Sequence, residues 1–320
     1  MRLTVGICTW NRAWLLEQTL VSMRGLSIPS GVEWELLIVN NNSTDDTDKI
    51  IERYSKSLPI RGLVEPKPGK AHALNLAARE ARGEYILWTD DDVFVDKDWM
   101  VGYCEAFKRH PGATFFGGPI EPLFAGVLPP WLKRSWRQVG GAYALRELGE
   151  QPVRFSEQLL PYGANLALRA SEQAKYCYDT RLGPRPNSAI RGEEVALLQR
   201  MLADEHDGWW VPAAKVRHYI PESRQTMKYL RGYFFGLGER DWLQNGEGTG
   251  PKLFGKPRWL WRRAIECEIK YRVRRCLCRP EVWIEDMKAA SHAWGLLRGY
   301  AAPGAAVDSR MLNKDISVGS

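Results

Sequence analysis

Three consecutive aspartates, Asp90, Asp91 and Asp92, follow the apolar run 85–88 after a single threonine. Carboxylate oxygens are preferred ligands of Mg²⁺ and Mn²⁺, and an ion held by one or two carboxylates keeps coordination positions open for substrate phosphates. A solvated turn is the alternative, because Asp is common in turns. Three adjacent like charges repel one another, however, and residues 93–95 are apolar again. The triplet therefore favours a metal site for phosphate chemistry.

The elements that must position this triplet alternate between strand and helix. We predict strands at 3–8, 34–39, 60–64 and 85–89, and helices at 14–23, 45–54 and 71–82. This alternation predicts an α/β fold with a doubly wound, mostly parallel sheet. Ligands of such sheets bind beyond the carboxyl ends of the strands, where the strand order reverses. Three polar loops should therefore converge on one crevice: 9–12, 40–46 and 90–92.

After residue 99 the alternation decays. Glycines and prolines interrupt it at 117–119 and 129–131, and residues 139–161 have an irregular pattern, as expected of a region that shapes a substrate cavity. Further on we predict a helix at 193–202, strands at 209–211 and 215–219, and a largely helical segment at 226–300.

The composition is that of a globular protein, with 44% hydrophobic and 26% charged residues in 320. The chain has no run of 18 apolar residues and begins in a strand pattern instead of a secretion signal, so we expect a cytoplasmic protein. The six cysteines are scattered, and we expect reduced thiols, mostly in the core. Residues 250–256 have the spacing of a phosphate-binding loop, but Pro257 replaces the required Ser or Thr and no strand precedes them.

Five motifs occur in a characteristic order: Thr9-Trp10-Asn11-Arg12, 39–45, 69–75, the aspartate triplet, and Gly192-Glu193-Glu194. Together they resemble family-two glycosyltransferases of the GT-A fold over about residues 1–240. Each motif is weak alone, but the ordered set is specific. The resemblance implies a bacterial, non-processive, inverting transferase that moves a sugar, typically a hexose, from a nucleotide-diphosphate donor in a metal-dependent reaction.

The resemblance also implies roles for the charged residues. Asp92 is the expected main ligand of Mn²⁺ or Mg²⁺, and His218 is at a position where relatives offer an imidazole to the metal or the diphosphate. Such a cation stabilises the charge that develops on the leaving phosphate. Glu194 matches the second acidic residue of the base motif, where Asp is usual, and Glu193 is the second candidate. The alternative is that both glutamates only begin the helix that follows them.

We expect the donor to contact nine residues: Thr9, Asn11, Arg12, Asn40, Asn41, Lys70, Asn75, Asp90 and Asp91. Many uridine-binding relatives have Asp where this chain has Asn40 and Asn41. An amide can still donate and accept hydrogen bonds, so nucleotide binding is retained, while the preference for UDP over GDP or TDP is weakened. Lys70 could approach the diphosphate as a point charge, and Asn75 would brace the site from a helix.

The expected organisation is a nucleotide-sugar-binding half at 1–105, an acceptor-binding half at 106–235, and a helical, basic and aromatic extension with a loose tail at 236–320. Residues 252–279 contain ten Lys or Arg and two Glu, a net charge of +8 against +7 for the whole chain. Six aromatic or aliphatic residues interleave with these charges: Trp259, Trp261, Ile265, Ile269, Tyr271 and Val273. This segment either lies on an anionic bilayer or packs as an amphipathic helix on the catalytic domain.

The leading hypothesis is a transferase of cell-surface polysaccharide biosynthesis that uses a UDP-sugar and a saccharide or lipid-linked acceptor. Its location would be the cytoplasm, at the cytoplasmic face of the membrane if the basic segment makes peripheral contact, and no nucleic-acid partner is expected. Two alternatives remain open: a nucleotide-sugar-binding protein without turnover, and a nucleotidyltransferase, which also places aspartates on an α/β sheet.

Overall fold

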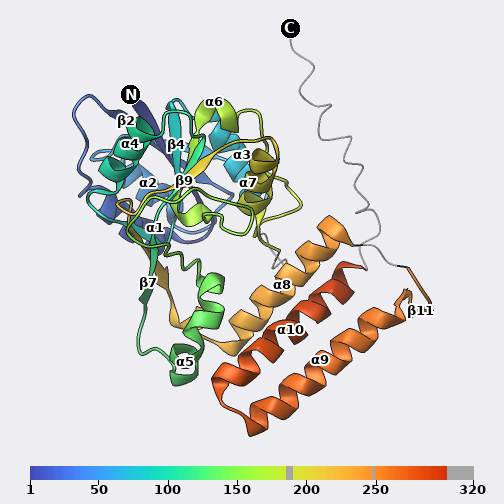
Figure 1. Cartoon of the computed structure of the whole chain (residues 1–320). Helices are drawn as coiled ribbons and strands as arrows, with labels where there is room; N and C mark the ends of the chain where they lie inside the picture. The colour runs from blue at the N-terminus through green and yellow to red at the C-terminus, as the bar shows by residue number, and fades with distance from the viewer. Residues whose placement is uncertain (185–189, 247–248, 301–320) are drawn as a thin grey trace. The chain divides into compact units, whose positions relative to one another are not determined.

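The computed structural model describes residues 1–184, 190–246 and 249–300 (Figure 1). The chain divides into two compact units, Met1–Thr226 and Met227–Ser320. The predicted loose tail at 301–320 lies outside the described residues.

The first unit begins with the predicted alternation of strands and helices. Its elements are β1 (Arg2–Thr9), α1 (Ala13–Met23), β2 (Glu33–Asn40), α2 (Thr47–Tyr54), β3 (Ile60–Val64), α3 (Lys70–Glu80) and β4 (Tyr85–Asp90). The strands β1, β2 and β4 are buried along nearly their whole length, on both faces. That burial explains their continuous apolar runs, since a parallel strand covered by helices on both sides has no polar face.

Within the described part of the chain, the main sheet has seven strands in the order β3-β2-β1-β4-β8-β6-β9, where β6 is Phe115–Gly117, β8 is Leu166–Arg169 and β9 is Gly208–Trp210. The strands β1 to β4 are mutually parallel, whereas β8 is antiparallel to both β4 and β6. The predicted α/β class is therefore confirmed, as a mixed and mostly parallel sheet. The strand order reverses at β1, and the register pairs Thr9 with Asn40 and Cys8 with Asp90, so the three predicted loops emerge side by side.

A smaller sheet holds the residues that follow the triplet. Its strands are β5 (Val93–Val95), β10 (Val216–Ile220) and β7 (Ile120–Phe124), in the order β5-β10-β7. The antiparallel register of β10 and β5 pairs His218 with Val93. A residue far along the chain is thereby fixed next to the aspartates. Neither β5 nor β7 was expected, because β5 has only three residues and β7 is interrupted by Glu121 and Pro122, so both give little periodic signal.

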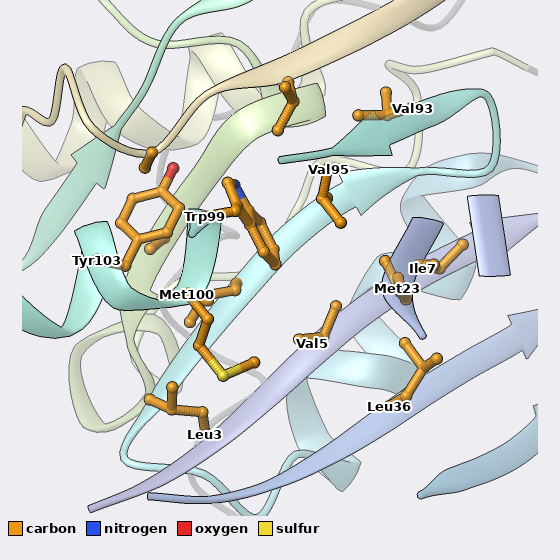
Figure 2. Packing of buried hydrophobic residues seen from close by; sticks show 14 of the residues in the cluster. Leu3, Val5, Ile7, Met23, Leu36, Val93, Val95, Trp99, Met100 and Tyr103 are labelled. Carbon is orange, nitrogen blue, oxygen red and sulfur yellow. The ribbon is translucent and has the colours of Figure 1, made fainter. Parts of the chain in front are cut away.

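Helices cover both faces of the main sheet. On one face, α1 and α4 (Trp99–Arg109) contribute Met23, Trp99 and Met100 to a core that includes Val5 of β1 (Figure 2). On the other face, α3 and α7 (Glu193–Ala203) form a second apolar cluster. The remaining helices of this unit are α5 (Pro130–Val139), α6 (Ala170–Gln173) and short 3-10 turns.

Asn165 joins this core to the loops around the site. It is fully buried, and its Oδ1 accepts hydrogen bonds from Trp99 Nε1 at 2.8 Å and Tyr103 Oη at 2.7 Å. Its Nδ2 donates to the carbonyl oxygens of Pro119 at 2.9 Å and Ala214 at 2.7 Å. All the amide's polar capacity is therefore used, as burial of a polar side chain requires.

In its described residues, 227–246 and 249–300, the second unit has three long helices and a hairpin: α8 (Met227–Asn245), β11 (Lys252–Leu253), β12 (Lys256–Pro257), α9 (Arg258–Leu277) and α10 (Pro280–Gly299). Helix α10 packs against both α8 and α9 (Figure 1). Small residues permit the close approach of α8 and α10: a Cβ on Gly238 would lie 2.1 Å from the carbonyl oxygen of His292. None of the described helices has the length and apolarity needed to cross a bilayer.

Two details of this unit bear on the sequence predictions. Residues 250–256 contain the β11 strand and its turn, which confirms that they are not a phosphate-binding loop after a buried strand. Tyr271, which we grouped with the membrane-facing residues, is instead buried and lies beside Trp283, because it is on the side of α9 that packs on α10.

The prediction for the cysteines is half right. All six are free thiols. Only Cys104 is buried, however, and three are exposed: Cys177, Cys276 and Cys278. The expectation of a mostly core location was therefore wrong, because those three lie in a surface loop and at the exposed end of α9.

Candidate active site

The aspartate triplet occupies the carboxyl end of β4 and the turn into β5. Asp91 and Asp92 are buried, with 3% and 2% of their surface exposed, and Asp90 is half-buried. A buried carboxylate is stable only when cations or hydrogen-bond donors compensate its lost hydration. Each of the three aspartates has such partners, and the partners differ.

Asp91 joins the triplet to the loop after β1. Its Oδ2 accepts a hydrogen bond from Thr9 Oγ1 at 2.8 Å, and its Oδ1 accepts one from Arg12 Nη1 at 2.8 Å. Burial raises the pKa of Asp91, and Arg12 opposes this shift. Both carboxylate oxygens of Asp91 already accept hydrogen bonds, so we infer that Asp91 orients Arg12 and does not itself bind a ligand.

Asp92 is surrounded by cationic groups. Its Oδ2 lies 3.1 Å from Nη1 of Arg12 and 3.1 Å from Nη1 of Arg224, and its Oδ1 lies 3.4 Å from Nε2 of His218. Burial would raise the pKa of Asp92, but His218 and the two arginines outweigh burial and hold that pKa far below its usual range. These partners therefore stabilise the ionised form of Asp92.

His218 is oriented by the backbone. Its Nδ1 lies 2.7 Å from the carbonyl oxygen of Tyr143, which can only accept, so Nδ1 carries a proton and Nε2 faces Asp92. Burial lowers the pKa of His218, but the charge of Asp92 and its hydrogen bond outweigh burial, and the net pKa is raised. Support of one imidazole nitrogen by a carbonyl is the usual arrangement around a metal-binding histidine.

Asp92 and His218 have the ligand chemistry that suits a divalent cation. Carboxylate and imidazole are both ligands of Mn²⁺, and an ion that acts on phosphates takes few protein ligands. Among the described residues, no group of three or more His, Cys, Asp or Glu is placed to hold a metal. Such a pair would therefore need oxygen atoms from substrate and water to complete its coordination.

A second charged cluster lies at the start of α7. Lys70 Nζ is 2.6 Å from Asp90 Oδ1 and 3.9 Å from Glu193 Oε1. These three residues and Glu194 line one narrow pocket. Burial lowers the pKa of Lys70, but Asp90 and Glu193 outweigh it, so the ammonium group stays charged.

The two glutamates of this pocket have different environments. Glu193 is 3% exposed, and burial together with the charge of Glu194 raises the pKa of Glu193 to about 7, although Lys70 opposes the shift. Glu194 is half-buried and lies beside Gly163. The pocket therefore contains one carboxyl group that can hold or release a proton near neutral pH and one that is more accessible.

Two of the predicted donor-binding asparagines hold the first two loops in shape. Asn11 has a left-handed backbone with a φ of 51°, and its Oδ1 accepts a hydrogen bond from the backbone N–H of Thr44 at 2.7 Å. Asn40 Nδ2 donates to Asp48 Oδ1 at 2.7 Å, and Asn40 Oδ1 accepts from the N–H of Ser43 at 2.9 Å. Contact of these amides with a donor remains a prediction.

The other two asparagines fasten more distant segments. Asn41 Nδ2 donates to the carbonyl oxygen of Glu65 at 2.9 Å, and Asn41 Oδ1 accepts from the N–H of Gly69 at 2.8 Å. Asn75 forms both possible hydrogen bonds with the backbone of Tyr178, at 2.9 Å and 2.8 Å. Asn75 thus fastens α3 to Tyr178, which lines the narrow pocket, and its role toward a donor stays a prediction.

The predicted residues therefore form two adjacent groups around the triplet. Thr9, Arg12, Asp92 and His218 meet on one side, and Lys70, Asp90, Glu193 and Glu194 meet on the other. Arg224 contacts Asp92, whereas Arg217 is exposed on the strand face opposite His218. The carbonyl of Tyr143 was missed, because a backbone acceptor leaves no mark in the sequence.

Comparison with known proteins agrees with this arrangement. Residues 4–156 match the family described as Glycosyl transferase family 2. The chain is 32% identical over 106 residues to poly-beta-1,6-N-acetyl-D-glucosamine synthase of Staphylococcus epidermidis, a match of 33% of this chain and 25% of that protein. It is 24% identical over 135 residues to succinoglycan biosynthesis protein ExoM of Rhizobium meliloti, covering 42% and 43%. The matched segments therefore cover 25% and 43% of the lengths of these two relatives.

Solved structures share the fold over nearly the whole chain. A mannosyltransferase from Pyrobaculum calidifontis in complex with GDP-Man and Mn²⁺ has a TM-score of 0.59 at 18% identity, covering 92% of this chain and 86% of that one. TarS residues 1–349 from S. aureus has a TM-score of 0.54 at 14% identity, covering 93% and 90%. The predicted GT-A fold is thereby confirmed. Residues 4–156 therefore resemble glycosyltransferase family 2, and the relatives that match include named synthases of polysaccharides.

Proposed function

We propose that this protein transfers a sugar from a nucleotide-diphosphate donor, a UDP-sugar, to a saccharide or lipid-linked acceptor in cell-surface polysaccharide biosynthesis. The observation that carries the proposal is the meeting of Asp92, His218, Arg12 and Arg224 at the strand-order reversal of a domain that matches glycosyltransferase family 2. Two arginines and a histidine surround one carboxylate, so several groups that can donate to the oxygen atoms of a diphosphate gather at this point.

Asp92 and His218 are the residues that would hold Mn²⁺ or Mg²⁺. When bound, the ion supplies Lewis-acid stabilisation of the negative charge on the departing diphosphate. Arg12 and Arg224 flank these two residues and can donate to phosphate oxygens. Lys70 is engaged with Asp90, so in this proposal it fixes Asp90 for hydrogen bonding to the donor and adds positive charge.

The proposed step is a single displacement with inversion at the anomeric carbon. The acceptor hydroxyl oxygen forms the new bond to that carbon while the bond from the carbon to the diphosphate oxygen breaks, and the nucleotide diphosphate leaves with the electron pair. Glu194 takes the proton of the hydroxyl group, because it is the more accessible carboxylate of the narrow pocket. Glu193 is the reserve proton acceptor, with a pKa of about 7.

Among structures with this fold, TarS has been solved with UDP-GlcNAc and the archaeal mannosyltransferase with GDP-Man. These two donors therefore serve as the first probes. We expect UDP-GlcNAc with Mn²⁺ to raise the melting temperature of the purified protein more than GDP-Man does, because a ligand of the native state stabilises it. An equal absence of response to nucleotide sugars of both kinds would contradict the proposal.

Turnover separates the proposal from its two alternatives. We expect release of UDP that depends on an added saccharide or lipid-linked acceptor and that falls at least about 100-fold in Glu194→Gln, the scale typical of a lost general base. Donor binding without any transfer would indicate a binding protein. Pyrophosphate release from a sugar phosphate and a nucleoside triphosphate would indicate a nucleotidyltransferase. The reaction is proposed to occur in the cytoplasm, at the membrane face where lipid-linked acceptors are available.

A further inference from the structure

Helix α9 has a row of aliphatic side chains on its outer face. Ile265, Ile269, Val273 and Leu277 follow one another at intervals of four residues, and their exposed fractions are 47%, 57%, 51% and 78%. Residues four apart in a helix lie above one another on the same side. The four side chains therefore form one continuous apolar strip on the surface.

This strip is not needed for the core of its unit. The buried side of α9 carries Leu260, Ala264 and Tyr271, which lie on the face that packs against α10. An ordinary surface helix has one apolar face toward the core and a polar face toward water. Helix α9 has apolar residues on both, so the outer strip requires a separate explanation.

Positive charge borders the strip. Helix α9 contains seven Lys or Arg and two Glu, a net charge of +5. Arg258 and Arg263 have no ion-pair partner within the described part of the chain. Long basic side chains can lay their methylene stems along an apolar surface while the charged ends reach toward phosphate or water.

The hairpin before α9 adds a second exposed apolar element. Phe254 at its tip is 83% exposed, between Lys252 and Lys256. The turn is tight, with φ of 50° at Phe254 and 76° at Gly255. Trp261 of α9 donates a hydrogen bond from Nε1 to the carbonyl oxygen of Leu253 at 2.9 Å, so the hairpin is fastened to the helix that carries the strip.

We propose that the aliphatic strip of α9 and the Phe254 tip form a docking surface for an anionic lipid bilayer. Exposed aliphatic and aromatic side chains enter the boundary of headgroups and acyl chains, while Lys and Arg are attracted to acidic headgroups. The charge argues against a second copy of the chain as the occupant, because self-association through this face would bring two helices of charge +5 together.

The test uses the full-length protein and sedimentation with vesicles, in the absence of nucleotide sugar. One set of vesicles is pure phosphatidylcholine, and the other contains about 30 mol % phosphatidylglycerol as the anionic lipid. We expect binding to the anionic vesicles that is at least about tenfold tighter than to the neutral ones and that weakens as salt is raised. Equal binding to both kinds of vesicle, or none to either, would overturn the proposal.

Variants locate the surface. Ile269→Ser with Val273→Ser should weaken binding to anionic vesicles at least about tenfold, and Phe254→Ser should weaken it separately. Val127→Ser is the matched control, because Val127 is a 91% exposed aliphatic residue of the first unit. All four side chains are surface-exposed, so circular dichroism and the melting temperature should stay unchanged. Strip variants that bind like the wild type would refute the assignment.

Arg258→Gln with Arg263→Gln tests the charge separately and should reduce binding to the anionic vesicles only. If the wild type instead self-associates and the strip variants abolish that association without affecting vesicle binding, the surface joins two copies and the proposal fails. Sugar transfer to a water-soluble acceptor does not depend on this surface. Failure of the vesicle experiment is therefore distinguishable from failure of the proposed function.

Discussion

Replacement of Arg224 by Gln tests most directly the proposed diphosphate site beside Asp92. Arg224 Nη1 lies 3.1 Å from Asp92 Oδ2, and the side chain is mostly buried, with 18% of it exposed. Gln keeps a hydrogen-bond donor but is shorter than Arg and loses the charge. A preorganised donor to a developing phosphate charge is worth about 100-fold or more in rate. Because each factor of ten corresponds to 1.36 kcal/mol, we expect kcat/KM to fall about 100-fold, or about 2.7 kcal/mol.

The same strand region offers a matched control. Arg217 is exposed on the opposite face of β10, so Arg217→Gln removes one positive charge from the same part of the chain without touching Asp92. We expect its kcat/KM to stay within about twofold of the wild type, since a solvated charge outside the site contributes little. The assay is initial-rate release of UDP with acceptor varied. If Arg224→Gln and Arg217→Gln behave alike, the assignment of Arg224 to the diphosphate site is refuted.

Three further predictions concern stability and the metal. Asn165→Ala should lower the free energy of unfolding by about 4 kcal/mol or more, measured by urea denaturation, because it leaves four buried hydrogen-bonding groups without their partner; a loss below about 1 kcal/mol would contradict the hydrogen-bonding role. Glu193 has its pKa raised to about 7 from 4.5, so the folded state binds its proton more tightly than the unfolded state and wild-type stability should decline between about pH 4.5 and pH 7. In Glu193→Gln, the decline in the free energy of unfolding over this pH range should be smaller by up to about 3 kcal/mol, as measured by unfolding curves at several pH values. If the variant and the wild type have the same pH profile, the pKa of Glu193 is not raised. Removal of divalent ions with EDTA should abolish transfer and added Mn²⁺ should restore it in the wild type but not in Asp92→Asn, whereas full activity in EDTA would exclude the metal-dependent form of the proposal.

The sequence predicted the first half of the fold well because its strands are long and buried on both faces. The strands β1, β2 and β4 have continuous apolar runs that end in polar clusters, and the structure has them within two residues of the predicted bounds. The short strands β5 and β7 gave no comparable signal, because their environment comes from pairing with β10 and not from local periodicity. For the same reason, the sequence did not predict individual elements within the irregular residues 139–161.

The candidate site shows the same division between local and distant information. The loop residues that converge on the site could be predicted because each loop follows a strand, and the carboxyl ends of parallel strands lie at one edge of the sheet. Their pairings were not predictable. Nothing in the residue types indicates that Asn41 and Asn75 use their amides on backbone groups, or that Arg224 and not Arg217 reaches Asp92. Such choices depend on the faces of strands and on loop paths that only the folded chain defines.

The charges around the triplet give a physical reason to expect a cation with the donor. Three aspartates face three permanent cations: Asp90 pairs with Lys70, Asp91 and Asp92 share Arg12, and Asp92 also pairs with Arg224. These charges balance before any donor arrives. A nucleotide diphosphate adds at least two negative charges to a partly buried site, where uncompensated charge is costly. His218 must be neutral to ligate an ion through Nε2, so its own charge would not offset them. A divalent ion between His218, Asp92 and the phosphates would supply the two positive charges that the side chains lack.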